Sequence, residues 1–289
     1  MRGACGLASA LMILKPGADS NCKVLLDETS ELLDREYTGL KPSLNRVGTR
    51  YQLACAYLLL QAARSETIQE ALVKYDAALY EDIQPVILYE MRVRMCGKRA
   101  GSGPIADMLD VFIETGKVPA RLLESYATTV KSNVEVKLLM ALFGYKTVAF
   151  PGSEDGTGAL TVAKASGKRW TKGCPAARDR SADEAFLMDN FDTCGILVLK
   201  DAHWSAVKSL TIEDGHEWSL HFLDPGIPRG QEFRLDPWNP RARLYFFKKD
   251  PGLQSKMARL VRGLLERPEP AEKGVTKPAL EEKEKEKGG

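Results

Sequence analysis

The sequence has few histidines and no closely spaced cysteine pairs, and both shortages narrow the chemistry it supports. Its three histidines all lie between positions 203 and 221. Its six cysteines are scattered, and no two of them form a Cys-x-x-Cys pair. This pattern argues against a disulfide framework and a structural zinc site, so we expect no metal. Any reaction that needs an imidazole must be built around residues 203–221.

The chain also lacks a charge excess and a long hydrophobic run. Its 41 basic and 39 acidic residues leave a formal net charge of +2, so we expect no nucleic-acid partner. No stretch approaches the roughly 20 apolar residues of a membrane span. The N-terminus has no signal-peptide pattern, so we expect a cytoplasmic protein unless a dedicated apparatus secretes it. Composition does not determine an oligomeric state.

Hydrophobic periodicity divides the chain into a helical part, a strand-rich part and a tail. Residues 1–144 are expected to form a helical lobe, with helices from Cys5 and over 23–35, 46–64, 66–80, 84–95, 104–114 and 133–143. Residues 145–266 are expected to form an antiparallel β lobe, with strands over 145–150, 194–199, 203–212, 217–223, 231–235 and 243–248 and a closing helix over 253–266. This order is typical of an α+β fold. The close spacing of the strands from 194 to 248 predicts an antiparallel meander. Residues 267–289 alternate Pro, Lys and Glu, which predicts a disordered charged tail.

The run from Cys5 to Leu14 is almost wholly apolar. A helix over this run has no polar face, so we expect it to be buried on all sides. A cysteine at its N-terminus lies near unpaired N–H groups and the positive end of the helix dipole, which stabilise a thiolate. The alternative is that Cys5 is only a small apolar core residue, the commonest fate of a free cysteine.

Two of the expected strands place a histidine near an aspartate. Residues 203–212 and 217–223 are expected to form a hairpin around Asp214-Gly215. A loop of even length puts His203 opposite Gly226 and makes Asp224 its diagonal neighbour on one face, about 7–8 Å away between backbones. A loop of odd length exchanges the faces and reverses this choice. His216 and His221 are interpreted as surface or sheet residues.

Cys5, His203 and Asp224 are therefore candidates for nucleophile, general base and orienting group. The cysteine and the histidine need to be adjacent only in the fold, whatever their separation in sequence. Such a triad works without a cofactor, and we expect none.

Three segments resemble papain-like cysteine peptidases, and most of all the branch related to the bacteriocin-leader-processing peptidases. They are Cys-Gly-Leu-Ala-Ser-Ala-Leu from Cys5, His-Trp-Ser-Ala-Val from His203 and Leu-Asp-Pro from Leu223. In that group a Cys-Gly motif opens the central helix, a Gly-His-Trp or Gly-His-Phe segment opens a strand, and an Asp-Pro ends the next strand. The resemblance implies a nucleophile at Cys5, a base at His203 and an orienting carboxylate at Asp224.

The resemblance also implies a papain-like fold with a cleft between the helical lobe and the sheet. The implied reaction is hydrolysis of a peptide or isopeptide bond in a peptide or protein substrate, through a thioester acyl-enzyme. Trp204 is then either core packing or a wall of the cleft. The backbone N–H groups of Cys5 and Gly6 are the candidate oxyanion donors.

The sequence departs from the family pattern at three places. Ala202 replaces the glycine before the histidine, and the helical region 15–143 is longer than the smaller leader-peptidase domains need. That region would supply specificity or a partner surface. No glutamine precedes Cys5, although the family commonly uses one in the oxyanion hole. Either residues precede Met1 in the natural protein, or the hole uses another donor, or activity is impaired. Losing one such donor typically costs about 10²–10³ in rate.

Three other functions fit the same residues. The triad suits an amide hydrolase, deamidase or transamidase, which ammonia release would distinguish from a peptidase. Cys-Gly-Leu also resembles the start of N-terminal-nucleophile amidotransferases, which would require removal of residues 1–4. The third alternative is a catalytically inactive papain-like binding module, whose Cys5 would be unreactive.

Overall fold

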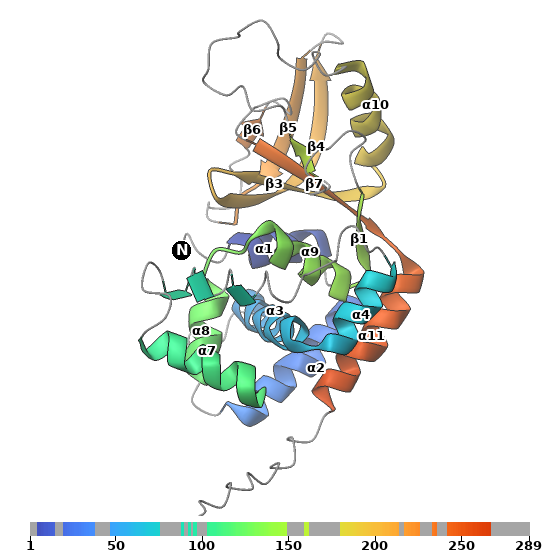
Figure 1. Ribbon diagram of the computed structural model, residues 1–289. Helices are drawn as coiled ribbons and strands as arrows, with labels where there is room; N and C mark the ends of the chain where they lie inside the picture. Colours follow the sequence, from blue (N-terminus) through green and yellow to red (C-terminus); the bar gives the residue numbers. More distant parts are fainter. Residues whose placement is uncertain are drawn as a thin grey trace, which may run out of the picture.

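The helices and the sheet share a hydrophobic core, and the first helix lies between them (Figure 1). The computed structural model describes residues 5–14, 20–37, 47–75, 88–89, 92–93, 95–96, 103–148, 159–161, 180–213, 217–225, 233–235 and 242–266. Most helices precede the strands along the chain, and every strand pair is antiparallel. The α+β class expected from the sequence is therefore confirmed.

The helical part begins with α1 and ends at the first strand. Its helices are α1 (Cys5–Leu14), α2 (Asn21–Glu36), α3 (Val47–Arg64), α4 (Glu66–Tyr75), α7 (Pro104–Thr115), α8 (Ala120–Thr128) and α9 (Asn133–Leu142). Ser132 and Glu135 form a capping box at the start of α9, because each side chain accepts the backbone N–H of the other residue. The predicted helix over 84–95 lies mostly outside the described residues.

Helix α8 is not among the predicted helices, although its sequence carries a signal. Its buried side chains repeat with helical spacing and are Leu122, Leu123, Tyr126 and Ala127. Pro119, which precedes the helix, has an extended backbone, as a residue flanking a helix start often does. The apolar pattern covers few residues and the residues around it are polar, so the sequence of this segment resembles that of a loop.

The sheet contains β1 (Tyr145–Val148), β2 (Ala159–Thr161), β3 (Cys194–Lys200), β4 (His203–Glu213), β5 (Glu217–Leu223), β6 (Phe233–Leu235) and β7 (Ala242–Lys249). The strand order is β1-β7-β3-β4-β5-β6, and β2 also pairs with β7. Strands β3 to β6 form the expected meander, but β7 returns to lie between β1 and β3. A simple meander along the whole sheet is therefore wrong, and β2 is an additional strand.

The last strand takes this inner position because β3 and β7 are apolar on both faces. One face carries Ile196, Val198, Leu244 and Phe246, and it packs against α10 (Arg180–Phe191) through a perpendicular contact of Phe186 with Phe246. The other face belongs to the core that includes the helices. Strands buried on both faces are most stable in the middle of a sheet.

The closing helix α11 (Pro251–Leu265) packs against the helices, although it follows the sheet in sequence. It contacts α9, α2 and α4 (Figure 1). Asp250 caps its N-terminus by accepting the N–H of Leu253, and Tyr75 on α4 donates its hydroxyl hydrogen to the same carboxylate. The helical part is thus completed by the last helix that the structure describes. Residues 267–289, the expected tail, lie outside the described residues.

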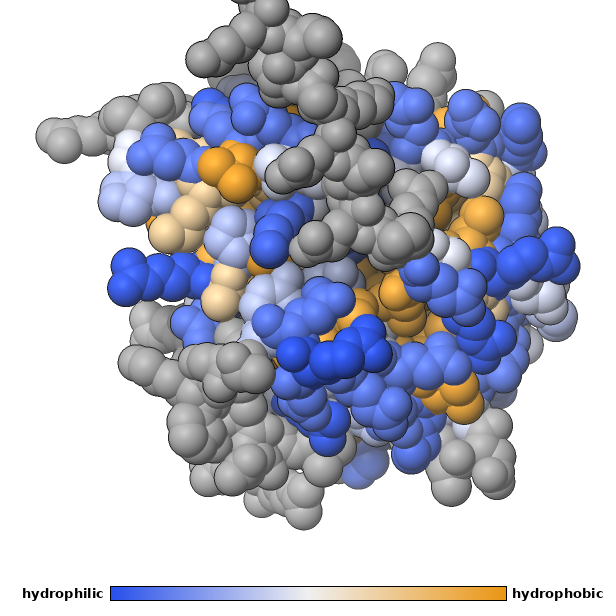
Figure 2. Space-filling model, turned by 90° about the horizontal axis from the view of Figure 1, so that it is seen from below, coloured by the Kyte–Doolittle hydropathy of each residue, from blue (hydrophilic) through white to orange (hydrophobic). Residues whose placement is uncertain are grey.

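The face below the helices is mostly hydrophilic. Figure 2 shows hydrophobic side chains there as spots between charged and polar ones. Among the described residues, Val24 on α2 and Val111 on α7 are exposed hydrophobic side chains of the helical part. Single exposed apolar residues of this kind are normal on a protein surface.

Helix α1 is buried on all sides, as its sequence predicts. It packs against β3 and β4 on one side and against α3 and α9 on the other, and none of its residues is exposed. The helix approaches the sheet closely at Gly195 on β3, where a Cβ atom would lie 2.3 Å from Cγ2 of Ile13. A glycine is therefore needed there for the helix to lie against the strand.

We predict that Gly195→Ala destabilises the protein by about 1–3 kcal/mol, because the new methyl group overpacks this contact. Ile13→Ala removes the opposing atoms, so Gly195→Ala in that background should cost clearly less. Urea unfolding of the two single variants and the double variant measures this coupling. Strictly additive free energies of unfolding would contradict the predicted contact.

Candidate active site

His203 and Asp224 form a hydrogen bond at one end of the sheet. His203 is the first residue of β4, and Asp224 directly follows β5. The imidazole Nε2 lies 2.7 Å from a carboxylate oxygen of Asp224. Their side chains are 34% and 12% exposed, so the ring is accessible while the carboxylate is largely covered. An ionised carboxylate only accepts hydrogen bonds, so Nε2 carries the proton and Nδ1 is the nitrogen left to accept one.

A β-bulge in β4 puts these two residues on one face of the sheet. Glu213 pairs with Glu217, which leaves three residues in the hairpin loop, so the loop has the odd length that by itself would exchange the faces. The register then shifts by one residue between Val207 and Ser209. Beyond the bulge, Val207 pairs with Phe222, the register that an even loop would have produced. The odd loop and the bulge therefore cancel, and the resulting register keeps His203 and Asp224 on one face of the sheet.

Helix α1 lies across the sheet with its N-terminus toward the end that carries His203. Its last turn meets the start of β3, where Ile13 lies against Gly195. Nearer its start, Ser9 donates its hydroxyl hydrogen to the carbonyl oxygen of Trp204, at 3.0 Å. Strand β3 runs from Gly195 toward the β3–β4 turn, so the two contacts fix the direction of the helix. Cys5, the first residue of α1, is thereby directed to the His203 end.

Gly6 fits this end of the helix because its neighbours leave no room for a side chain. A Cβ atom at Gly6 would lie 2.9 Å from Cβ of Lys131 and 3.3 Å from Cδ1 of Trp204. Trp204 is fully buried and donates its indole N–H to the carbonyl oxygen of Lys131, at 2.8 Å. Its indole therefore packs in the core, one of the two roles that the sequence suggests for it.

The Cys5 side chain is buried, and the residue is 3% exposed. Its thiol makes no hydrogen bond with any residue that the structure describes. The structure thus joins the candidate base and the candidate orienting group directly, and it brings the candidate nucleophile to the same end of the sheet through the packing of α1. Strand alternation puts the His203 side chain on the sheet face of Val198 and Phe222, whereas α1 covers the face of Trp204. The backbone N–H groups of Cys5 and Gly6 lie in the first turn of α1, where helical N–H groups have no partner within the helix.

Buried polar contacts near this end were not predicted from the sequence. Lys131 lies between α8 and α9 and is 1% exposed, although a lysine among threonines and serines between two helices resembles a solvated loop residue. Ser9 is also fully buried. Its position one helical turn after Cys5, on the same side of α1, was the only available signal.

The other two histidines are not part of this arrangement. His221 is 9% exposed, and its ring lies 2.9 Å from the Thr211 hydroxyl on the neighbouring strand, as suits the predicted sheet residue. His216 lies in the hairpin loop, outside the described residues.

The described residues contain no cluster of three or more His, Cys, Asp or Glu side chains arranged to bind a metal ion. Within the described ranges, no helix is both long and apolar enough to cross a membrane.

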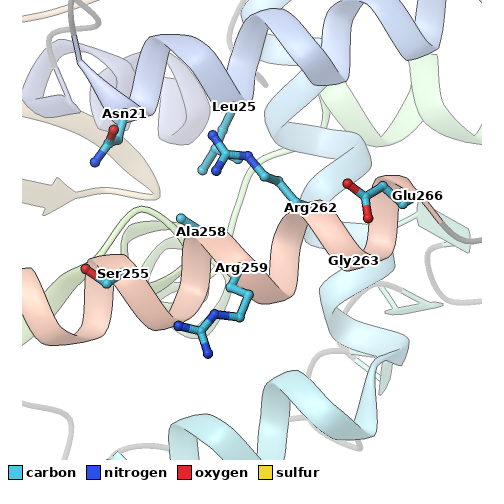
Figure 3. Close-up of a pocket in the computed structure, with 8 residues that line it drawn as sticks. All are labelled: Asn21, Leu25, Ser255, Ala258, Arg259, Arg262, Gly263 and Glu266. Atoms are coloured by element: carbon cyan, nitrogen blue, oxygen red, sulfur yellow. The ribbon is translucent and has the colours of Figure 1, made fainter.

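A surface groove of about 620 Å³ lies between α2 and α11, away from these residues (Figure 3). It is lined by Asn21, Leu25, Ser255, Ala258, Arg259, Arg262, Gly263 and Glu266. Figure 3 shows Arg262 pointing toward α2 and Arg259 pointing away from it, and Arg262 also pairs with Glu28 at 3.3 Å. The two guanidinium groups do not converge, so the groove has no preformed anion site.

Comparison with known proteins gave no match: no family model, no curated protein and no solved structure is significantly similar to the chain. The functional interpretation therefore depends on the three sequence motifs and on the geometry of the residues that carry them.

The turn between β3 and β4, which directly precedes His203, is strained. Lys200 pairs with His203, so Asp201 and Ala202 form a two-residue loop, and both have positive φ angles of 49° and 60°. A left-handed backbone costs an ordinary residue about 1–2 kcal/mol, while glycine adopts it freely and aspartate tolerates it. Ala202 stands where the resembling family has glycine, so this departure has an energetic cost.

We predict that Ala202→Gly stabilises the protein by about 1 kcal/mol by removing this strain. Asp201→Gly is the matched control and should stabilise less, because aspartate accepts the left-handed region better than alanine. Urea midpoints at equal m-values compare the two variants. A loss of stability in Ala202→Gly would show that the turn does not have this conformation in solution.

Proposed function

We propose that the protein is a cysteine-type hydrolase, a peptidase that cleaves a peptide or isopeptide bond through Cys5, His203 and Asp224. The observation that carries this proposal is the 2.7 Å hydrogen bond between His203 and Asp224, at the end of the sheet toward which α1 directs Cys5. The papain-like sequence motifs lie on these elements in the order the proposal requires.

In the proposed reaction, Nδ1 of His203 takes the proton of the Cys5 thiol, and the thiolate attacks the substrate carbonyl carbon. Asp224 holds the ring with its proton on Nε2 and stabilises the imidazolium that forms. His203 then protonates the leaving amine, which leaves a thioester on Cys5. Water, deprotonated by the same imidazole, hydrolyses this thioester and regenerates the thiol.

The first turn of α1 provides stabilisation for the oxyanion. Backbone N–H groups of Cys5 and Gly6 point toward the helix N-terminus, where the helix dipole favours negative charge. Among the described residues the Cys5 thiol has no hydrogen-bond partner, which is compatible with a role as nucleophile, because catalytic hydrogen bonds in a free enzyme are often long and tighten with substrate bound. The reaction uses no cofactor.

Mutation of the three residues tests the proposal directly. Cys5→Ser should abolish hydrolysis of a fluorescently labelled, denatured protein such as casein, and His203→Asn should lower kcat/KM by about 10²–10⁴. Asp224→Asn should also lower it, because the ring loses its preferred tautomer. His221→Asn is the matched control and should keep full activity. Hydrolysis at an undiminished rate in Cys5→Ser would overturn the proposal.

Iodoacetamide labelling at pH 7, mapped by mass spectrometry, tests the nucleophile without a substrate. Cys5 should react first, and its rate should fall at least about tenfold in His203→Asn, since the imidazole no longer accepts the thiol proton. Burial raises the pKa of the Cys22 and Cys55 thiols, so both stay protonated and unlabelled in the native protein. An unreactive Cys5 would favour an inactive binding module.

The same variants separate peptidase from deamidase or transamidase. Peptide cleavage creates new amino termini, whereas action on a side-chain amide releases ammonia. Ammonia without new termini, lost in Cys5→Ser, would assign the triad to amide chemistry.

A further inference from the structure

Lys131 is a buried lysine whose ammonium group is held by backbone oxygens. It is 1% exposed, and lysine is seldom so fully buried unless its charge is compensated. Its Nζ donates to the carbonyl oxygens of Tyr126 and Thr129, at 2.5 and 2.6 Å, and lies 4.1 Å from the centre of the Tyr126 ring. These carbonyls belong to the C-terminal end of α8, the negative end of its dipole. The ammonium therefore fixes the turn between α8 and α9.

The remainder of Lys131 contacts both elements of the proposed site. Its Cβ and Cγ pack on Gly6, next to Cys5 in the first turn of α1. Its carbonyl oxygen accepts the indole N–H of Trp204, the residue that follows His203. Within the described structure, Lys131 thus links the helix start that carries the nucleophile to the strand start that carries the base.

We propose that Lys131 is a positioning residue that sets the placement of His203 relative to Cys5. This inference rests on the proposed function, because it assigns a role in the same site. The ammonium anchors the turn, the anchored carbonyl holds the Trp204 indole, and Trp204 fixes the backbone of its neighbour His203. A misplacement of about 1 Å in such a site costs up to about 10²-fold in rate.

Two variants break the link at different points. Lys131→Met keeps most of the side-chain length and removes the ammonium, and Trp204→Phe keeps a ring and removes the indole N–H. Each should lower kcat by about 10- to 100-fold with little change in KM, because substrate binding is retained while the reacting groups are misplaced. The double variant should be no slower than the worse single variant, because both changes break one link.

Lys137→Met on α9 is the matched control, since Lys137 is also a buried lysine, at 6% exposure. It should lower stability and leave kcat unchanged. The Trp204 indole N–H, followed by NMR, should be protected from exchange in the wild type and in Lys137→Met but not in Lys131→Met. Trp204→Phe carries the kinetic test if Lys131→Met does not fold.

The proposal is overturned if Lys131→Met and Trp204→Phe keep wild-type kcat, or if Lys137→Met lowers kcat as much at equal stability. Cys5 alkylation by iodoacetamide separates this result from failure of the proposed function. If Cys5→Ser remains active, the proposed function is wrong. The positioning role of Lys131 is then tested by alkylation alone: it holds if Lys131→Met slows Cys5 alkylation as His203→Asn does. Unchanged alkylation in Lys131→Met, with fast alkylation in the wild type, overturns the positioning role alone.

Discussion

The burial of α1 between the sheet and the other helices is the constraint on which this structure depends. A helix without a polar face has to be covered on all sides, so the strands and the helices both form around it. Two glycines allow the close approach: Gly6 makes room for Lys131 and Trp204, and Gly195 makes room for Ile13. The same contacts determine which end of the sheet receives Cys5. The contacts that pack the core therefore also place the proposed nucleophile.

The sheet also brings a histidine and an aspartate together across a hairpin. The odd loop alone would put His203 on the wrong face, and the bulge before Ser209 corrects the register. The odd loop pairs Leu210 with Leu220 and the bulge pairs Val207 with Phe222, so Leu210 and Val207 both lie on the face of the apolar cluster that packs under α10. One irregularity in β4 thus satisfies both hydrophobic burial at one end of the hairpin and the polar pair at the other.

The candidate active site concentrates features that oppose stability. Ala202 has a left-handed backbone, Lys131 buries a charge, and Asp224 is largely covered. Each is compensated locally, since the ammonium is bound by carbonyl oxygens and the carboxylate by an imidazole. Strain and buried charge of this kind are commonly found where a protein holds groups for chemistry. This concentration agrees with the proposed hydrolase, for which the His203–Asp224 pair remains the central observation.

The sequence by itself determined the α+β class and most element positions, because periodicity and residue type act locally, and it nominated His203 and Asp224 as a candidate pair. It placed Cys5 at the start of a helix with no exposed residue for the same reason. It missed α8, the return of β7 to the middle of the sheet and the burial of Lys131. The strand return and the lysine burial depend on contacts between segments far apart in the chain, which no local pattern encodes, whereas α8 has a short helical pattern between polar neighbours. The bulge in β4 was decided only by the tertiary structure, because its register reflects the faces that the rest of the sheet must bury.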